Sequence, residues 1–210
     1  MNGFQLKLFA VLTMTIDHIG AVLFPEYRIL RIIGRIAFPI YAAMIAEGVV
    51  HTHNRRRYLG QLVLCGVLSE LPFRWVFGGR GLGLYNVLFT LALGAGACIL
   101  WEKKHRFFAL LMPAAAYFLQ TDYQWFGVAT VLMFFILRDH RRTEQAFALA
   151  MMIFVFVQSG GSSATEFFAL LAMIPLGFYN GTRGSSGGKY GKYAFYLYYP
   201  AHLTVLALIA

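Results

Sequence analysis

The stretch KLFAVLTMTIDHIGAVLFPEYRILRIIGRIAFPIYAAMIAE, residues 7–47, decides the fold. It reads as two apolar helices, each close to the roughly 20 residues that cross a bilayer. Ionisable side chains interrupt both helices: Lys7, Asp17, His18, Arg31, Arg35 and Glu47. Such groups are costly within a membrane, so each is a candidate functional residue. His18 is the foremost candidate, because an imidazole titrates near neutral pH and can carry protons.

The composition extends this interpretation to the whole chain. Of its 210 residues, 59% are hydrophobic and 13% are charged, whereas an ordinary soluble domain has roughly 25% charged residues. The sequence therefore predicts an all-α polytopic membrane helix bundle, in a single domain over residues 1–210. At about 20 residues a span, we expect about nine spans, within a range of about eight to ten. They cover residues 4–24, 29–50, 58–78, 83–101, 106–120, 123–138, 145–159, 164–180 and 193–210.

The basic residues indicate how the chain is oriented in the membrane. The formal net charge is +9, and the basic side chains gather in alternate loops, as the positive-inside rule requires. We therefore expect a multi-pass protein of the inner membrane with a cytoplasmic N-terminus, and no nucleic-acid partner. The first apolar run contains Asp17 and His18 and lacks a small-residue cleavage site. It is expected to be a permanent span rather than a signal peptide.

Two faces of the first helix carry different candidates. Lys7 and His18 are eleven residues apart, which at about 100° per residue places them on one face, about 16 Å apart along the axis. Asp17 points to another side, because adjacent residues of a helix do not face each other. We therefore expect Asp17 to pair with a basic residue of the next helix, such as Arg35. That pair could belong to an active site, or it could simply lock two helices together.

Further candidates lie near the cytoplasmic end of the second span. Glu47 is followed by the basic run Arg55–Arg57. These arginines could be a topology signal, or they could bind phosphate through their planar guanidinium groups. His51 and His53 have no third ligand in the sequence, so no metal site is predicted.

Two more ionisable residues fall inside apolar runs. Glu70 lies in the third span, where Pro72 is expected to break the helix, and His202 lies in the last span beside Pro200. Intramembrane histidines, carboxylates and an arginine fit a proton-coupled transporter, or group transfer with histidine as general base. A chain of this length lacks the paired halves common in transporters, which favours the enzyme.

Several motifs resemble one family along essentially the whole chain. They are KLFAVLTMTIDHIG, LRIIGRIAFPIYAAMIAEG, HTHNRRRYLGQL, LSELPF, NVLFT, IPLGFYNGTRG and KYAFYLYYPAHL. In this order they resemble the TraX family, membrane proteins named for the enzyme that acetylates the N-terminus of conjugative pilin. That family is similar to the broader transmembrane acyltransferase superfamily, whose first-helix histidine follows a basic residue by eleven positions. Here these residues are His18 and Lys7, with lysine in place of the arginine usual in O-acetylases.

The resemblance implies an acyltransferase that uses acetyl-CoA as co-substrate and needs no metal. The residues that it assigns to acetyl-CoA are Lys7, Glu47, Arg55, Arg56 and Arg57. Those that it assigns to catalysis are His18, as general base or acyl carrier, and around it Asp17, Arg35, Glu70 and His202. Arg35 is the residue best suited to stabilise a tetrahedral oxyanion.

The acceptor and the oligomeric state stay open at this point. A peptide N-terminus, a sugar or a small amine could receive the acetyl group. The alternatives to the enzyme are a proton-coupled transporter, which would move a solute without consuming thioester, and a non-enzymatic assembly factor, which would not bind CoA. Lipid-facing and partner-facing apolar surfaces look alike in sequence, so no oligomer is predicted.

Overall fold

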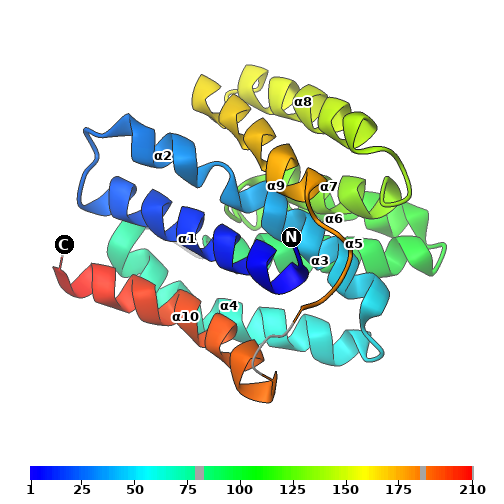
Figure 1. Ribbon diagram of the computed structural model, residues 1–210, viewed down its shortest axis with the longest axis horizontal. Helices are drawn as coiled ribbons and strands as arrows, with labels where there is room; N and C mark the ends of the chain where they lie inside the picture. Colours follow the sequence, from blue (N-terminus) through cyan, green and yellow to red (C-terminus); the bar gives the residue numbers. More distant parts are fainter. Residues whose placement is uncertain (79–82, 185–187, 210) are drawn as a thin grey trace. The chain divides into compact units, whose positions relative to one another are not determined.

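The computed structural model describes residues 1–78, 83–184 and 188–209, without the side chains of residues 188–193. Every regular element in these ranges is a helix, which confirms the all-α prediction (Figure 1). The elements are α1 (Gly3–Val22), α2 (Arg28–Gly34), α3 (Ala37–His51), α4 (Arg55–Phe77), α5 (Val87–Glu102), α6 (Arg106–Phe118), α7 (Gln124–Ile136), α8 (Arg142–Gln158), the 3-10 helix η1 (Ala164–Ala172), α9 (Met173–Gly177) and α10 (Gly188–Ile209).

The helices follow the expected spans, but the second span is divided. α2 ends at Gly34 and α3 begins at Ala37. Between them, the backbone N–H of Arg35 donates to the carbonyls of Arg31 and Ile32, each at 3.2 Å. Sharing one N–H between the carbonyls three and four residues back tightens the end of a helix. The position of Arg35 is therefore set by a turn between two helices rather than by a continuous helix.

The prediction that Pro72 breaks its helix is wrong, because α4 continues through Pro72 to Phe77. A proline inside a helix removes one backbone hydrogen bond and presses on the carbonyl four residues earlier. The turns on either side of this defect are intact. Ser69 Oγ donates to the carbonyl of Cys65 at 2.7 Å, and the N–H of Gly78 donates to the carbonyl of Arg74 at 3.0 Å. The loss is therefore confined to one position of a continuous helix.

One stretch of the described residues has both the length and the hydropathy of a membrane-crossing helix, namely Arg28–His51, which combines α2 and α3. Five shorter apolar stretches accompany it: Val87–Glu102, Arg106–Phe118, Gln124–Ile136, Ala164–Gly177 and Ala194–Ile209. A bundle that crosses the membrane many times thus stays a prediction.

The chain divides into two compact units. The first joins Met1–Tyr41 to Arg141–Ala210, and the second is Ala42–His140. A single domain over residues 1–210 stays a prediction.

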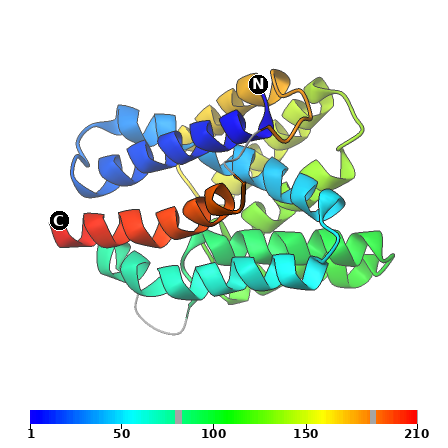
Figure 2. The same ribbon diagram turned by 60° about the horizontal axis from the view of Figure 1, so that its bottom comes forward.

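In the first unit, α1 and α2 form an antiparallel pair (Figure 2). They approach closely at Gly20, where a β-carbon would overlap the side chain of Leu30. The start of α1 is held by the segment that follows α9. The N–H groups of Gly3 and Phe4 donate to the carbonyls of Thr182 and Arg183 at 2.7 and 3.1 Å. This segment thus satisfies N–H groups that a helix start leaves without intrahelical partners.

In the second unit, α5 packs against α4, α6 and α7. Small residues allow these contacts: a β-carbon at Gly66 would press on the ring of Phe89, and one at Gly94 would overlap Val131. Cys65 and Cys98 are both buried. They fill space in this core, as buried cysteines usually do.

Candidate functional site

A pair of histidines joins α1 to α10 in the first unit. His18 Nδ1 lies 2.7 Å from His202 Nε2, a hydrogen-bonding distance, and the two ring planes are within 4° of parallel. The pair is partly buried. The sequence nominated both histidines for their position in apolar segments, and the structure brings them into direct contact across 184 positions of the chain.

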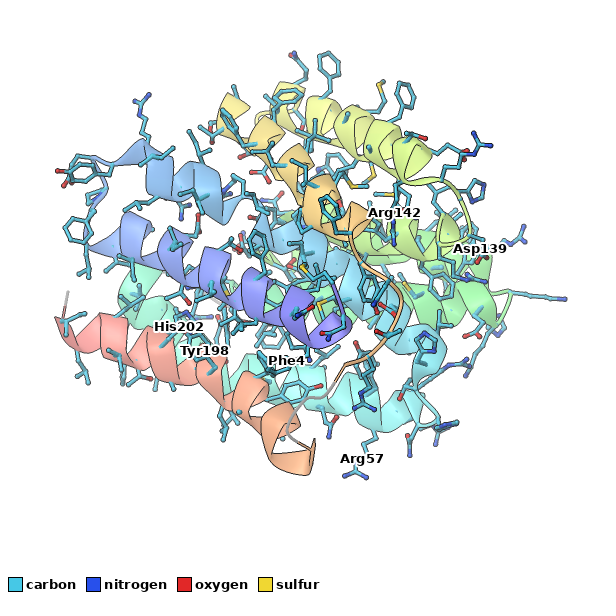
Figure 3. All side chains as sticks on the ribbon, viewed as in Figure 1. Phe4, Arg57, Asp139, Arg142, Tyr198 and His202 are labelled. Atoms are coloured by element: carbon cyan, nitrogen blue, oxygen red, sulfur yellow. The ribbon has the colours of Figure 1, made fainter. Side chains whose placement is uncertain are left out.

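Tyr198 holds the α10 side of this pair (Figure 3). Its ring stacks on that of His202, with 5.1 Å between the ring centroids and 13° between the planes. Its hydroxyl lies 2.7 Å from Thr15 Oγ1 on α1. Thr15 precedes His18 by about one helical turn, and Tyr198 precedes His202 by about one turn. The contacts Thr15–Tyr198 and His18–His202 therefore lie one turn apart on both helices, and together they set the register of α1 against α10.

Asp17 binds two arginines, Arg31 in α2 and Arg35 directly after it. Its carboxylate lies 2.5 Å from Arg31 Nη1 and 3.2 Å from Arg35 Nη2. The predicted pairing of Asp17 with Arg35 is present, and Arg31 joins it. As expected from their adjacent positions on α1, Asp17 and His18 thus serve different contacts.

Glu166 of η1 completes this cluster and was missed by the sequence analysis. Arg35 Nη1 donates to Glu166 Oε2 at 3.1 Å, and Ser162 Oγ donates to the same oxygen at 3.3 Å. The Glu166 side chain is 1% exposed, and its Oε1 has no hydrogen-bond partner among the described residues. The available signal was a single acidic residue in the apolar segment 164–180.

The cluster balances its charges. Two carboxylates, Asp17 and Glu166, meet two guanidinium groups, Arg31 and Arg35. Arg35 is held between both carboxylates and is 13% exposed, whereas the Arg31 side chain is 37% exposed. Asp17, which pairs with both arginines, directly precedes His18 in α1. The ion-pair cluster thus adjoins the histidine pair, and Arg31 is its more accessible cation.

Lys7 lies nearer the start of α1. Its Nζ is 4.8 Å from the centroid of the Phe195 ring on α10, a cation–π contact. Lys7 therefore helps to join the same two helices that carry His18 and His202.

The predicted phosphate-binding arginines lie at the start of α4, in the second unit. Arg55 pairs with Glu102 of α5 at 2.6 Å. Arg56 and Arg57 are exposed, and the side chain of Arg57 projects away from the ribbon (Figure 3). Glu47 lies 3.7 Å from His51, one turn further along α3. Arg56 and Arg57 are thus the members of the basic run that are presented to the surroundings.

Glu70 is enclosed by hydrogen-bond donors of the second unit. Its carboxylate accepts from Arg74 Nε at 2.9 Å, from Asn86 Nδ2 at 2.6 Å, and from the backbone N–H groups of Tyr85 and Asn86 at 3.2 and 3.4 Å. Asn86 in turn caps α5 through the N–H of Leu88. Glu70 thus attaches the start of α5 to the end of α4.

Within the described ranges, no three or more His, Cys, Asp or Glu side chains gather as ligands for a metal ion.

Known proteins resemble this chain in sequence. A model of the TraX protein family matches residues 2–210. The chain is 35% identical over 106 residues to the probable fimbrial assembly protein FimC, serogroup H1, of Dichelobacter nodosus, covering 44% of this chain and 43% of that protein. It is 35% identical over 89 residues to an uncharacterized protein of Rickettsia prowazekii (strain Madrid E), covering 42% of this chain and 33% of that protein. The chain thus covers less than half the length of these two relatives. No solved structure matches it.

Proposed function

Because this chain belongs to the TraX family, we propose that it is an integral membrane acetyltransferase that moves an acetyl group from acetyl-CoA to an amine or hydroxyl acceptor. The observation that carries the proposal is the hydrogen-bonded pair of His18 and His202 beside the cluster of Asp17, Arg31, Arg35 and Glu166. A base whose Nδ1 is hydrogen-bonded to a second imidazole, near two guanidinium groups that carboxylates hold in place, suits acyl transfer.

The proposed reaction is a transfer at the thioester carbon. His18 takes a proton from the acceptor nitrogen or oxygen, which attacks the acetyl carbonyl. The bond from the acceptor to that carbon forms and the carbon–sulfur bond breaks. The proton held by His18 goes to the departing sulfur, so the products are the acetylated acceptor and CoA. In the alternative order, the acetyl group passes first to His18 and then to the acceptor.

The arginines of the first unit are proposed to stabilise the oxyanion of the tetrahedral intermediate. Positively charged donors that are fixed before reaction stabilise such charge without reorganising. The sequence favoured Arg35 for this task. Arg35 is engaged by Asp17 and Glu166, so we assign the direct contact to the more exposed Arg31, with Arg35 orienting Asp17 behind it.

The phosphates of acetyl-CoA are assigned to the exposed side chains of Arg56 and Arg57. Arginine binds phosphate through paired N–H groups. Arg55 is engaged by Glu102 and Lys7 by the ring of Phe195, so both are expected to contribute less.

A membrane location is supported by the apolar side chains on the protein's outside. Soluble monomers rarely expose contiguous apolar patches larger than about a few hundred Å². Here large apolar side chains are exposed on several helices, including Trp75 (62%), Phe107 (70%), Phe118 (80%), Phe147 (70%) and Leu208 (80%). We propose that these side chains face lipid in a multi-pass protein of the inner membrane.

For the acceptor, we propose the N-terminal amine of a pilin-type subunit. The Dichelobacter nodosus relative is named a probable fimbrial assembly protein, and the resemblance to the TraX family implies acetylation of pilin. A sugar or a small amine would use the same chemistry at His18. The relative's name also supports a second candidate, a membrane assembly factor without enzymatic activity.

Binding and transfer in the purified chain separate these candidates. The full chain in detergent is expected to bind acetyl-CoA and to acetylate a peptide carrying a free N-terminus. His18→Ala should keep acetyl-CoA binding and lose about 10²–10⁴-fold in transfer rate, the usual contribution of a general base. His105→Ala, which changes an exposed histidine before α6, is the control and should retain the wild-type rate.

Two results would overturn the proposal. A folded His18→Ala protein that binds acetyl-CoA and transfers at the wild-type rate would exclude His18. A wild-type chain that binds no acetyl-CoA in detergent or in lipid nanodiscs would favour the assembly factor. A proton-coupled transporter would instead move a solute and protons without releasing CoA.

A further inference from the structure

We propose that His202 is a positioning residue that holds neutral His18 in its Nδ1–H tautomer, so that Nε2 is the nitrogen of His18 that meets the substrate. The proposal deepens the proposed function and rests on it for the chemistry at Nε2. The tautomer itself follows from two linked hydrogen bonds, between the Tyr198 carbonyl and His202 and between His202 and His18. The donor and the acceptor of each can be derived by starting at the carbonyl.

That end is a backbone carbonyl, which can only accept. His202 Nδ1 lies 2.9 Å from the carbonyl oxygen of Tyr198, one turn back in α10. Nδ1 of His202 must therefore carry the proton and donate it. In a neutral imidazole one nitrogen donates and the other accepts. The lone pair of neutral His202 thus lies on Nε2.

The direction of the next hydrogen bond follows. His202 Nε2 is 2.7 Å from His18 Nδ1, and two lone pairs or two N–H groups at that distance would repel. His18 Nδ1 must therefore donate, and the lone pair of neutral His18 lies on Nε2. When Nε2 takes a proton or an acetyl group, the ring becomes positive while its Nδ1–H still donates to His202. A hydrogen bond from a charged donor is stronger than one between neutral groups.

The ring of His202 is held in this orientation from two sides. Tyr198 stacks on it with 5.1 Å between ring centroids, and the ring of Tyr199 lies at 5.4 Å with a tilt of 59°. Thr15 Oγ1 donates to the carbonyl of Val11 at 2.8 Å, so the Tyr198 hydroxyl is the donor in its 2.7 Å contact with Thr15. α1 thus anchors Tyr198, and Tyr198 orients the histidine that orients His18. A positioning residue of this kind touches no substrate.

The tautomer can be read by ¹⁵N NMR of the full chain in detergent with labelled histidine, at a pH where the pair is neutral. The chain has six histidines, and the His18→Gln spectrum identifies the His18 signals by difference. We expect a protonated Nδ1 and an unprotonated Nε2 for His18, with scalar coupling across the N–H···N bond to His202. A His18 protonated at Nε2 would overturn the proposal.

Two variants at position 202 test whether His202 determines the tautomer of His18. In His202→Gln, the side-chain carbonyl oxygen can replace Nε2 as acceptor, whereas His202→Leu offers no acceptor. The Nδ1–H tautomer should persist in His202→Gln and be lost in His202→Leu. Its survival in His202→Leu would overturn the proposal. If His202→Leu does not fold, the spectra of the wild type and of His202→Gln decide, and loss of the tautomer in a folded His202→Gln counts against the proposal.

Kinetics distinguish positioning from general structural support. We expect His202→Gln to keep kcat within about tenfold and His202→Leu to lose about 10²-fold or more, with the KM for acetyl-CoA unchanged in both. Equal kcat in folded His202→Leu and wild type would overturn the role of His202. The NMR result is independent of activity: the expected tautomer in a chain without transfer activity would contradict the proposed function and leave the hydrogen-bond assignment standing.

Discussion

Gly34 lies directly against the side chain of Asp17, so that a β-carbon at position 34 would overlap the carboxyl group. This close approach leaves the carboxylate between Arg31 and Arg35. Gly34→Ala is therefore expected to displace the carboxylate and to destabilise the fold by about 1–3 kcal/mol, the usual effect of overpacking. Thermal unfolding in detergent measures this effect.

A second glycine provides the control for this prediction. An added β-carbon at Gly96, inside α5, meets nothing within 4 Å. Gly96→Ala should leave stability unchanged or raise it by up to about 1 kcal/mol, since alanine favours a helix interior over glycine. If Gly34→Ala melts at the wild-type temperature, the packing of Asp17 against α2 is not a constraint on the fold.

The buried pair of Arg35 and Glu166 predicts a strong double-mutant coupling. Removing either partner leaves an unbalanced buried charge, which costs about 3–5 kcal/mol. Arg35→Leu and Glu166→Leu should each destabilise by this amount. Because the double variant restores charge balance around Asp17 and Arg31, it should cost less than the two single changes together.

An exposed ion pair provides the reference for this double-mutant comparison of Arg35 and Glu166. Asp139 pairs with Arg138 at 3.5 Å, with 83% of the Asp139 side chain exposed. Asp139→Asn should change stability by no more than about 1 kcal/mol. Strict additivity of Arg35→Leu and Glu166→Leu would show that the two side chains do not interact in the folded protein.

We expect a change at Glu70 to lower the stability of the fold rather than the transfer rate. Glu70→Gln replaces one acceptor oxygen by an NH₂ group, which then faces either the donors of Arg74 and Tyr85 or those of Asn86. We expect a loss of about 1–3 kcal/mol from the donors left unsatisfied, with the transfer rate per folded molecule retained. Glu26→Gln, in the exposed turn before α2, should be neutral. A normally stable Glu70→Gln protein that has lost transfer activity would return Glu70 to the catalytic group.

The members of the basic run should differ in their effect on acetyl-CoA. Arg56 and Arg57 are exposed, whereas Arg55 is bound to Glu102. Each hydrogen bond to a charged group contributes about 1.5–3 kcal/mol, so the double change Arg56→Ala, Arg57→Ala should weaken acetyl-CoA binding by at least about tenfold. Titration calorimetry at low and high salt measures it. An unchanged affinity would identify the run as a topology signal.

The helices of this fold could be predicted from the sequence, because each is a long apolar run bounded by polar or glycine-rich residues. The expected 106–120 and 145–159 correspond to α6 (Arg106–Phe118) and α8 (Arg142–Gln158). Three details differ: the second span is divided, α4 continues through Pro72, and the span at 164–180 is a 3-10 helix followed by α9. The division between α2 and α3 and the continuity of α4 through Pro72 depend on hydrogen bonds that periodicity does not report.

The candidate site was predictable only in part, for a related reason. An ionisable residue in an apolar run is visible in the sequence, so His18 and His202 could be nominated. Their contact could not, because it spans 184 positions. Glu166 was overlooked because its arginine lies 131 positions away and no local pattern links the two. Tyr198 was not among the candidate residues, because its contact with Thr15 depends on the register of two distant helices.

The capping of α1 by the carbonyls of Thr182 and Arg183 determines the order in which the fold can assemble as the chain is made. α1 leaves the ribosome before Thr182 and Arg183 are made, so two of its N–H groups lack these partners until then. The second unit, Ala42–His140, is continuous and is finished while the first is still incomplete. Since chain segments fold as they emerge, the pairing of His18 with His202 follows the synthesis of the second unit. A nascent chain that stops before residue 202 therefore cannot form the histidine pair.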